Sequence, residues 1–175
     1  MEALFGVSPR EKGKLSINGA EIEIHNPKDA IRHKIAFATE DRKRSGLNLI
    51  GSIKENITMV SLAEKISKHG IIQDKKEGEV TEEYIKKLRI KTPNGDELVG
   101  NLSGGNQQKV VLAKWLLGEP EIIIFDEPTR GIDVGAKHEI YELINALSEQ
   151  KKAIIVISSE MPELMGICDR LYVMS

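Results

Sequence analysis

Two uninterrupted apolar runs constrain the fold of this chain more than any other feature of its sequence. They are Ile-Ile-Ile-Phe at residues 122–125 and Ala-Ile-Ile-Val-Ile at residues 153–157. A strand that is covered on both faces needs such a run, whereas a strand with one wet face alternates apolar and polar residues. The sequence therefore predicts an α/β fold with a mostly parallel sheet between layers of helices.

Helices and strands alternate regularly from Ser103 onward. The expected helices cover residues 106–116, 134–148 and 161–165, and the expected strands cover residues 122–125, 153–157 and 170–174. This alternation is typical of a parallel sheet, because a helix returns the chain to the edge where the next strand begins.

The N-terminal part has different signals. Residues 1–7 resemble the tail of a helix, and residues 14–18 and 21–25 alternate around Asn18-Gly19, the signal for a tight antiparallel hairpin. A short helix is expected at residues 27–33, with Asn26 as its cap and Pro27 at its first position. A buried strand is expected at residues 35–39.

The pattern between residues 40 and 100 is polar and rich in helical signals, with expected helices at residues 53–62 and 81–88. We interpret this stretch as a helical insertion. The expected organisation is one partial domain over residues 1–175. It consists of a β subdomain with a core strand (8–39), a helical subdomain (40–102) and a C-terminal core (103–175).

Composition excludes several classes of protein. The 175 residues are 40% hydrophobic and 30% charged, as in a folded globular protein rather than a disordered one. The net charge of -2 gives no global field that would attract nucleic acid. No apolar stretch approaches the ~18 residues of a membrane span. One cysteine, Cys168, allows no internal disulfide, and nothing at the N-terminus resembles a signal peptide, so we expect a cytosolic location.

The first chemical signal is Ser103-Gly104-Gly105, directly before an amphipathic helix. Backbone N–H groups at a helix N-terminus are free to bind an anion, and the helix dipole favours negative charge there. This pattern indicates a phosphate site. The alternative is an ordinary serine cap followed by a flexible Gly-Gly hinge.

The second signal is the acidic pair Asp126-Glu127 at the end of the apolar run at residues 122–125. The carboxyl end of such a strand lies at the edge of the sheet, where Asp126 can hold Mg2+ through water. Glu127 is then placed to orient or deprotonate an attacking water molecule. The two signals together point to nucleotide chemistry.

Here the sequence resembles the ATP-binding-cassette family. Residues 102–107 match its signature motif, residues 122–126 its Walker B strand, and Glu127 its catalytic glutamate. Three longer segments, at residues 40–44, 106–109 and 127–137, look like the second cassette of the monosaccharide importers. The resemblance implies a P-loop NTPase-like core and ATP with Mg2+ as cofactors. The residues it implies for binding the nucleotide are Ser103, Gly104, Gly105, Asn106, Gln107 and Asp133.

The phosphate-binding loop of this family is absent from the sequence. No Gly-x-x-x-x-Gly-Lys-[Ser/Thr] string occurs, so both ends of the chain look like cuts within a longer cassette. We expect the fragment alone to be inactive and to bind ATP weakly. In the family, the strand that feeds this loop is expected beside the Walker B strand. We therefore expect a vacant position next to residues 122–125, filled by rearrangement or by pairing with a second copy.

Two positions depart from the family's pattern. Glu40 stands where the family usually has a glutamine, and Ser159 stands where it usually has the switch histidine. A serine has no imidazole with which to sense the terminal phosphate. The resemblance therefore leaves open whether the composite site that contains Glu127, Ser159 and Glu40 hydrolyses ATP.

Three functions are compatible with these residues. The first is an ATP-driven subunit of a sugar importer, with a nucleoside importer as a variant. The second is a catalytically silent module that contributes only its signature motif to a facing cassette. The third, an ATPase of the DNA-repair or translation-factor branch, lacks support because those branches do not combine residues 106–109 with residues 129–137 in this form.

The resemblance also implies partners and a location. The partners are the first cassette of the same parent chain or a second copy, membrane permease subunits and, indirectly, a sugar-binding protein. The location is the inner face of the cell membrane. The basic run Asp41-Arg42-Lys43-Arg44 is interpreted as a solvated surface loop, with a nucleic-acid or phosphate patch as the alternative. The resemblance implies a third option, a contact with the membrane subunits. Nucleic acid is not an expected partner.

Overall fold

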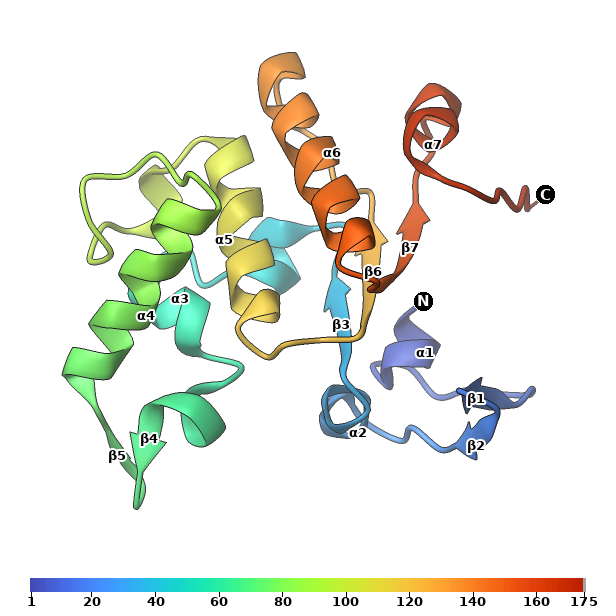
Figure 1. The fold of residues 1–175 in the computed structure, drawn as a ribbon, viewed down its shortest axis with the longest axis horizontal. Helices are drawn as coiled ribbons and strands as arrows, with labels where there is room; N and C mark the ends of the chain where they lie inside the picture. The colour runs from blue at the N-terminus through green and yellow to red at the C-terminus, as the bar shows by residue number, and fades with distance from the viewer. Residues whose placement is uncertain (175) are drawn as a thin grey trace.

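The computed structural model describes residues 1–174, and its centre is a three-stranded parallel sheet (Figure 1). The strands are β3 (Ile35–Ala38), β6 (Ile122–Asp126) and β7 (Ala153–Ile157), in the order β3-β6-β7. Ala36 pairs with Ile123, and Ile123 pairs with Ile154. The α/β fold with a parallel sheet is confirmed.

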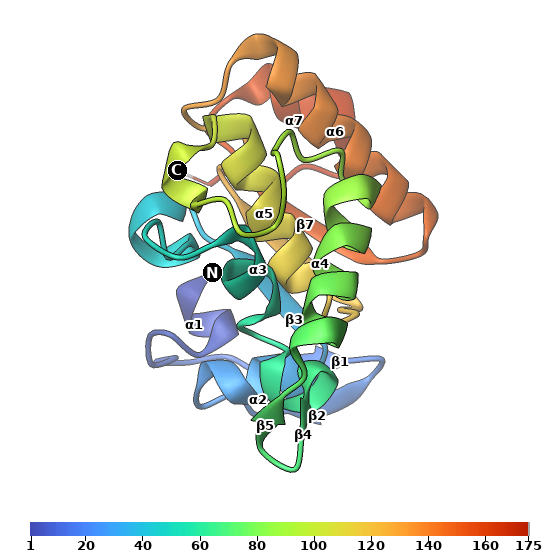
Figure 2. The ribbon, with the colours of Figure 1, turned by 90° about the vertical axis from the view of Figure 1, so that its left-hand side faces the viewer.

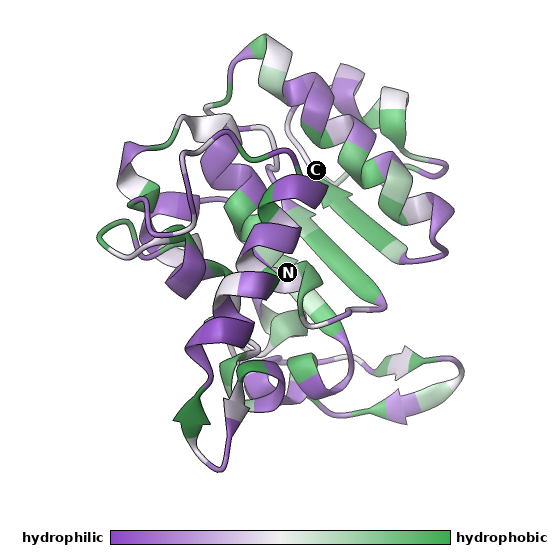
Figure 3. Ribbon diagram, turned by 60° about the vertical axis from the view of Figure 1, so that its left-hand side comes forward, coloured by the Kyte–Doolittle hydropathy of each residue, from purple (hydrophilic) through white to green (hydrophobic). Residues whose placement is uncertain are grey.

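Alternate residues of the strands face two separate hydrophobic clusters. Ile123 and Phe125 belong to the larger cluster, whereas Ile124 belongs to the smaller one. Each of these three side chains is at most 2% exposed. Burial on both faces explains why the strand sequence is apolar throughout rather than alternating. The strands are accordingly the most uniformly hydrophobic part of the ribbon in Figure 3.

The expected vacancy beside the Walker B strand is wrong. β6 lies in the middle of the sheet and is paired along its length with β3 on one side and β7 on the other. This apolar strand therefore has a neighbouring strand on each side and a hydrophobic cluster on each face, and its three central residues are buried. Within residues 1–174, the edge of β7 that faces away from β6 pairs with no strand.

Helices cover both faces of the sheet. The larger cluster packs between the sheet and α3 (Ile53–Thr58), α4 (Asp74–Lys87), α5 (Gly104–Leu116) and α6 (Val134–Glu149). The smaller cluster includes Phe5 of α1 (Glu2–Phe5) and Ala30 of α2 (Pro27–Arg32). The last helix, α7 (Met161–Ile167), contacts α6. No helix in the described part of the chain is long and apolar enough to span a membrane.

The N-terminal elements match their sequence signals. The hairpin consists of β1 (Leu15–Ile17) and β2 (Ala20–Ile22), which pair antiparallel. Its turn requires the left-handed backbone of Asn18 (φ 51°) and Gly19 (φ 81°), which asparagine and glycine tolerate best. The Asn26 side chain accepts a hydrogen bond from the Asp29 N–H, which caps α2 as expected.

The helical segment between β3 and α5 differs in detail from the expectation (Figure 2). The helix expected at residues 53–62 ends at Thr58, whose hydroxyl bonds to the Lys54 carbonyl and the Glu77 carboxylate. A separate π-helical turn, Leu62–Ile66, follows. The helix expected at residues 81–88 begins earlier, at Asp74, because acidic residues in its first turn favour an N-terminus there.

A small hairpin in this segment was not expected. Strands β4 (Ser67–Lys68) and β5 (Ile71–Ile72) are joined by His69 and Gly70, both in the left-handed region. A 3-10 turn, Val99–Asn101, then leads into α5. The division of the chain at residues 39/40 and 102/103 stays a prediction, since one hydrophobic cluster runs across both boundaries.

The strand expected at residues 170–174 is wrong. These residues are not in a strand, and Tyr172, Val173 and Met174 are 79–94% exposed. Apolar residues form a strand only where a neighbouring strand can accept their backbone hydrogen bonds, and within residues 1–174 nothing pairs with this segment. Ser175, the end of the expected C-terminal core, lies outside the described residues.

Candidate nucleotide site

The acidic pair after β6 sits where the sequence places it, at the carboxyl edge of the sheet. Asp126 is the last residue of β6, and Glu127 follows in the left-handed region with φ 47°. The Glu127 N–H donates to the Ile157 carbonyl at 2.8 Å. Its carboxylate accepts a hydrogen bond from the Ser159 N–H at 2.7 Å. The structure therefore brings Glu127 and Ser159 together, although only through the backbone of Ser159.

Partial burial sets the electrostatics of Asp126. Burial raises the pKa of this carboxyl, the N-terminal ammonium opposes the rise, and the carboxylates of Glu127 and Glu2 add to it. A carboxylate of this kind is a suitable Mg2+ ligand. Among residues 1–174, no group of three or more acidic, histidine or cysteine side chains could hold a metal ion alone. A cation at Asp126 would thus need most of its ligands from elsewhere.

The start of α5 forms the second part of the site. Ser103 occupies the position before the helix as expected, but its hydroxyl makes no capping hydrogen bond to the backbone. That hydroxyl instead accepts a hydrogen bond from the Asn106 side-chain amide at 2.9 Å. The side-chain Oδ1 of Asn106 accepts from the Lys91 N–H at 2.9 Å. Among the described residues, no side chain accepts a hydrogen bond from the first-turn N–H groups of α5, which suits an anion there.

A pocket of about 250 Å³ opens at this helix start. Asp133 lies in its wall and caps α6 by accepting a hydrogen bond from the Ala136 N–H at 3.0 Å. The structure thus brings Asp133 beside the signature residues. The lining consists of Lys91, Ser103, Gly105, Asn106, Asp133, Gly135, Ala136 and Glu139.

The two glycines at this helix start are packed rather than hinge-like. A Cβ atom on Gly105 would lie 2.5 Å from the Ala136 Cβ, so α5 and α6 could not approach as they do. A Cβ atom on Gly104 would lie 2.7 Å from Nη2 of Arg42 and 2.9 Å from the Gly131 carbonyl oxygen. The interpretation of Gly104-Gly105 as a flexible hinge does not fit these contacts.

Gln107 does not join the pocket. Its side-chain amide donates to the Val99 carbonyl at 3.2 Å, and the residue is 4% exposed. The Gln107 Oε1 atom is buried and has no hydrogen-bond partner in the described structure. The structure therefore places the Gln107 side chain inside the protein, away from the predicted nucleotide ligands.

Glu40 lies just after the end of β3 and forms an ion pair with Arg130, which belongs to the turn that follows Glu127. Arg42, two residues later, donates to the carbonyls of Arg130 at 2.7 Å and Gly131 at 3.2 Å. Lys43 and Arg44 are exposed as expected, but they lie in a π-helical turn, Arg42–Gly46, rather than in a loop, and Arg42 is only partly exposed. Arg42 has the same charge and a similar side chain to its neighbours in the basic run, so the sequence alone did not identify it as the residue that contacts the turn.

Glu163 is a second residue that sequence reasoning missed. It is 6% exposed, although it is a carboxylate in a polar segment. It accepts hydrogen bonds from the Thr129 hydroxyl at 2.8 Å and from the Ser158 hydroxyl. Glu163 therefore ties the segment that contains Ser159 to the turn after Glu127.

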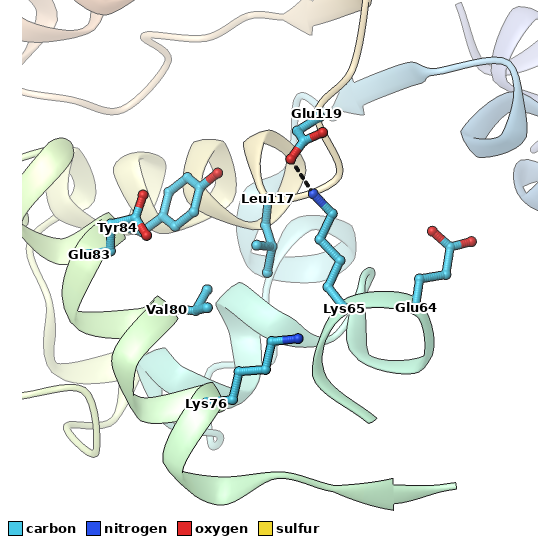
Figure 4. A pocket seen from close by; sticks show the side chains of 8 residues that line it. All are labelled: Glu64, Lys65, Lys76, Val80, Glu83, Tyr84, Leu117 and Glu119. Carbon is cyan, nitrogen blue, oxygen red and sulfur yellow. Dashed lines mark hydrogen bonds and ion pairs between the residues drawn. The ribbon is translucent and has the colours of Figure 1, made fainter. Parts of the chain in front are cut away.

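A larger pocket, of about 360 Å³, lies at the opposite end of α5 (Figure 4). Lys65 and Glu119 form a 2.5 Å ion pair at its edge. Burial raises the pKa of Tyr84 to about 12, with a further contribution from the carboxylates of Glu83 and Glu119. None of the expected site residues lines this pocket.

Relatives with high identity are import proteins. The chain is 52% identical over 174 residues to the ribose import ATP-binding protein RbsA of Clostridium perfringens strain 13, covering 99% of this chain and 35% of that protein. It is 51% identical over 173 residues to a putative ribose/galactose/methyl galactoside import ATP-binding protein of Rhizobium meliloti, covering 99% and 34%. It is 49% identical over 172 residues to the xylose import ATP-binding protein XylG of Thermoanaerobacter pseudethanolicus, covering 98% and 34%. The chain thus spans about a third of the length of these relatives.

Solved structures and a family model agree with this similarity. The fold matches the ATP-binding cassette MJ1267 with a TM-score of 0.80 at 20% identity, over 99% of this chain and 70% of that one. It matches MJ0796, a dimeric ATP-binding cassette in a post-hydrolysis state with ADP and Pi, with a TM-score of 0.74 at 19% identity, over 93% and 69%. The model of the ABC transporter family matches residues 1–130. The resemblance seen in the signature and Walker B segments is confirmed, and the chain belongs to the ABC transporter family.

Proposed function

We propose that this chain is the nucleotide-binding part of the ATP-binding subunit of an ABC-type sugar importer. The observation that carries the proposal is the uncapped start of α5, which opens into a pocket lined by Ser103, Asn106 and Asp133. The acidic pair Asp126-Glu127 at the carboxyl edge of β6 supplies the second half of the chemistry. The import of a sugar is taken from the names of the ribose, galactose and xylose relatives.

The residues present fit ATP and Mg2+ in part. Ser103 and the first-turn N–H groups of α5, including those of Gly104, Gly105 and Asn106, would hold phosphate oxygens. Asp126 would hold Mg2+, with phosphate oxygens and water completing its ligands. Glu127 would orient or deprotonate the attacking water. Bound Mg-ATP supplies the phosphoryl group and the charge neutralisation that its transfer needs.

The implied partners follow from the same proposal. The signature pocket would pack against the nucleotide site of a facing cassette, either in the parent chain or in a second copy. The membrane permease subunits would bind this pair of cassettes and change conformation with it. A sugar-binding protein would act indirectly. The parent complex would place this chain on the cytoplasmic face of the membrane as a peripheral subunit.

A second candidate, a catalytically silent nucleotide-binding module, is favoured by one contact. The only group of Ser159 that reaches Glu127 is its backbone N–H, at 2.7 Å. A backbone amide cannot exchange a proton with phosphate as an imidazole can. In this alternative, the chain contributes its signature pocket while the hydrolytic step occurs at the other composite site.

A chimaera tests the proposal. The matching 174 residues of the Clostridium perfringens ribose import ATP-binding protein would be replaced by this chain, and ribose uptake measured in cells that lack their own importer. We expect uptake, and we expect Ser103→Arg to abolish it by filling the pocket. A folded, expressed chimaera without uptake would contradict the proposal.

Glu127→Gln in the same chimaera separates the two candidates. A hydrolytic site should lose ATPase activity by about 100-fold or more when its general base is removed. A silent module should keep its ATPase activity within about twofold, because the base belongs to a site that does not turn over.

A further inference from the structure

We propose that Arg42 is a positioning residue that holds the turn after Glu127 against the start of α5, and so fixes the shape of the signature pocket. We name the group formed by Glu40, Arg42, Arg130 and Gly131 the clasp. Its function in nucleotide binding rests on the proposed function above, whereas the coupling itself is a property of the chain without ligand.

The contacts of the clasp join segments that are far apart in the sequence. Arg42 Nη1 donates to the Arg130 carbonyl at 2.7 Å, and Nη2 donates to the Gly131 carbonyl at 3.2 Å, across separations of 88 and 89 residues. The side chain of Glu40 forms an ion pair with the Arg130 guanidinium. In this second contact the charged group of residue 130 is its side chain, and the partner comes from the segment that also contains Arg42. Charge-assisted hydrogen bonds from a planar fork fix direction as well as distance. The loop after β3 therefore holds both the side chain of Arg130 and the backbone beside it.

The same guanidinium also lies against the signature loop. A Cβ atom on Gly104 would meet Nη2 of Arg42 at 2.7 Å and the Gly131 carbonyl oxygen at 2.9 Å. Gly131 itself has φ 67°, a conformation that favours glycine. Three segments consequently meet at one side chain, and the absence of side chains at Gly104 and Gly131 allows them to do so.

Arg42 also pays a desolvation penalty that a surface residue would avoid. Its Nε atom is buried and has no hydrogen-bond partner in the described part of the chain. A buried donor without a hydrogen-bond partner is unfavourable, so the Nε–H group of Arg42 destabilises this position. The two remaining contacts, to Arg130 and Gly131, are the gain that offsets it.

The position of the clasp determines what it can control. The turn that it holds begins at Glu127, whose carbonyl accepts from the Arg130 N–H at 3.1 Å. The turn continues through the Ile132 N–H, which donates to the Thr129 carbonyl at 3.2 Å, and ends at Asp133 in the pocket wall. Arg42 thereby acts through Gly131 and Asp133 and needs no contact of its own with the nucleotide.

The first test measures amide exchange by NMR in the unliganded 175-residue chain and its variants. We expect Arg42→Ala to speed exchange at the Arg130 and Ile132 amides by roughly tenfold or more, because the turn loses the two side-chain donors of Arg42. Lys43→Ala is the matched control, since Lys43 is the exposed neighbour, and it should leave these rates unchanged.

The conservative variant distinguishes positioning from simple packing. Lysine keeps the positive charge but cannot reach two carbonyls in fork geometry. Arg42→Lys should therefore rescue only part of the slow exchange at Ile132. The Ile144 amide of α6 serves as an internal reference, because an effect that is equal at Ile132 and Ile144 would report global destabilisation and would overturn the proposal. Unchanged rates in Arg42→Ala would overturn it too.

A spectroscopic signature comes from the buried Nε–H of Arg42 itself. In wild-type protein it should give a slowly exchanging side-chain cross-peak that disappears in Arg42→Lys and shifts in Glu40→Gln. A rapidly exchanging Arg42 Nε–H would contradict the clasp. Neither measurement involves nucleotide, so failure of the ribose-uptake chimaera would leave this result standing, and failure of the exchange test would leave the proposed importer function standing.

Discussion

Lys114 shows how a single buried charge can report on the fold. It is 5% exposed, donates a hydrogen bond to the Gly46 carbonyl, and lies 5.3 Å from the centre of the Trp115 ring. No carboxylate among residues 1–174 forms an ion pair with it. Burial therefore lowers the pKa of Lys114 to about 8.

This shift predicts how stability depends on pH. The ammonium of an unfolded lysine has a pKa of about 10.4, so between pH 8 and that value the unfolded chain binds more protons than the folded chain. The free energy of unfolding contributed by Lys114 therefore rises with pH in this window. Relative to Lys114→Met, the wild type should gain about 1 to 3 kcal/mol between pH 8 and 10.5 in urea titrations.

The control for this measurement is Lys12→Met, which makes the same change at an exposed position. The difference between wild type and Lys12→Met should stay flat over the same pH range. Parallel stability curves for wild type and Lys114→Met would contradict the prediction.

Motif residues could be predicted from the sequence, whereas buried charges could not. Asp126 and Glu127 follow from their place at the end of an apolar run, because a strand end fixes where such a side chain lies, whereas Asp133 follows only from the family resemblance. Arg42 and Lys114 look like ordinary surface residues in the sequence. Lys114 is buried and Arg42 is partly buried, and both depend on partners tens of residues away, Gly46 and Gly131, a contact that no local pattern encodes.

The packing of α5 against α6 depends on a glycine. A Cβ atom on Gly105 would lie 2.5 Å from the Ala136 Cβ, closer than real contacts allow. Gly105→Ala should therefore separate the two helices and lower the free energy of unfolding by about 1 to 3 kcal/mol, the usual cost of overpacking. Chemical denaturation of wild type and variant measures this difference in the free energy of unfolding.

Gly78 in α4 provides the opposite case. Nothing lies within 4 Å of a Cβ atom built there. Gly78→Ala should stabilise the protein by roughly 0.5 to 1 kcal/mol, because alanine loses less backbone entropy in a helix interior. A Gly105→Ala variant as stable as Gly78→Ala would show that α5 and α6 are not in close contact.

Element types could be predicted wherever the pattern was long. The apolar runs identified β6 and β7, but burial on both faces holds only for β6. In β7, Ala153 and Ile155 are exposed, so the expected cover on both faces of this strand is wrong. The apolar residues 170–174 were misassigned because strand formation needs a partner as well as a composition. The order β3-β6-β7 was also out of reach, since periodicity does not state which strand lies in the middle.

The isolated chain should bind Mg-ATP weakly. Its sequence contains no Gly-x-x-x-x-Gly-Lys-[Ser/Thr] loop, whose backbone amides supply many of the phosphate contacts in nucleotide sites of this kind. Isothermal titration calorimetry should show no saturable binding in the micromolar range, and the chain should have no ATPase activity. A micromolar dissociation constant would contradict this expectation.

The edge of β7 predicts how the chain behaves in solution. The Ala153 N–H donates to the Glu121 carbonyl, so alternation along a parallel strand points the N–H groups of Ile154 and Val156 away from β6. In a monomer these two amides should exchange faster than that of Ile155. Among the described residues, the unpaired strand edge therefore belongs to β7 and not, as the sequence suggested, to β6.

Pairing with a second copy would reverse this pattern, because an added strand would protect the outer amides of β7. We expect a concentration-dependent dimer in sedimentation, with Ile154 and Val156 protected as the dimer forms. A monomer at all concentrations, with both amides in fast exchange, would contradict the dimer and leave the β7 edge open.

The contact between α1 and α5 has an optical consequence. Trp115 is the chain's one tryptophan, and its ring meets Phe5 edge-on with centroids 5.4 Å apart. Phe5 packs in turn on Phe37 of β3, with ring centroids 5.5 Å apart. Undocking of α1 would expose the indole to water, and the emission of a single fluorophore would shift to the red. The chain therefore contains its own probe for the attachment of its first helix, without any label.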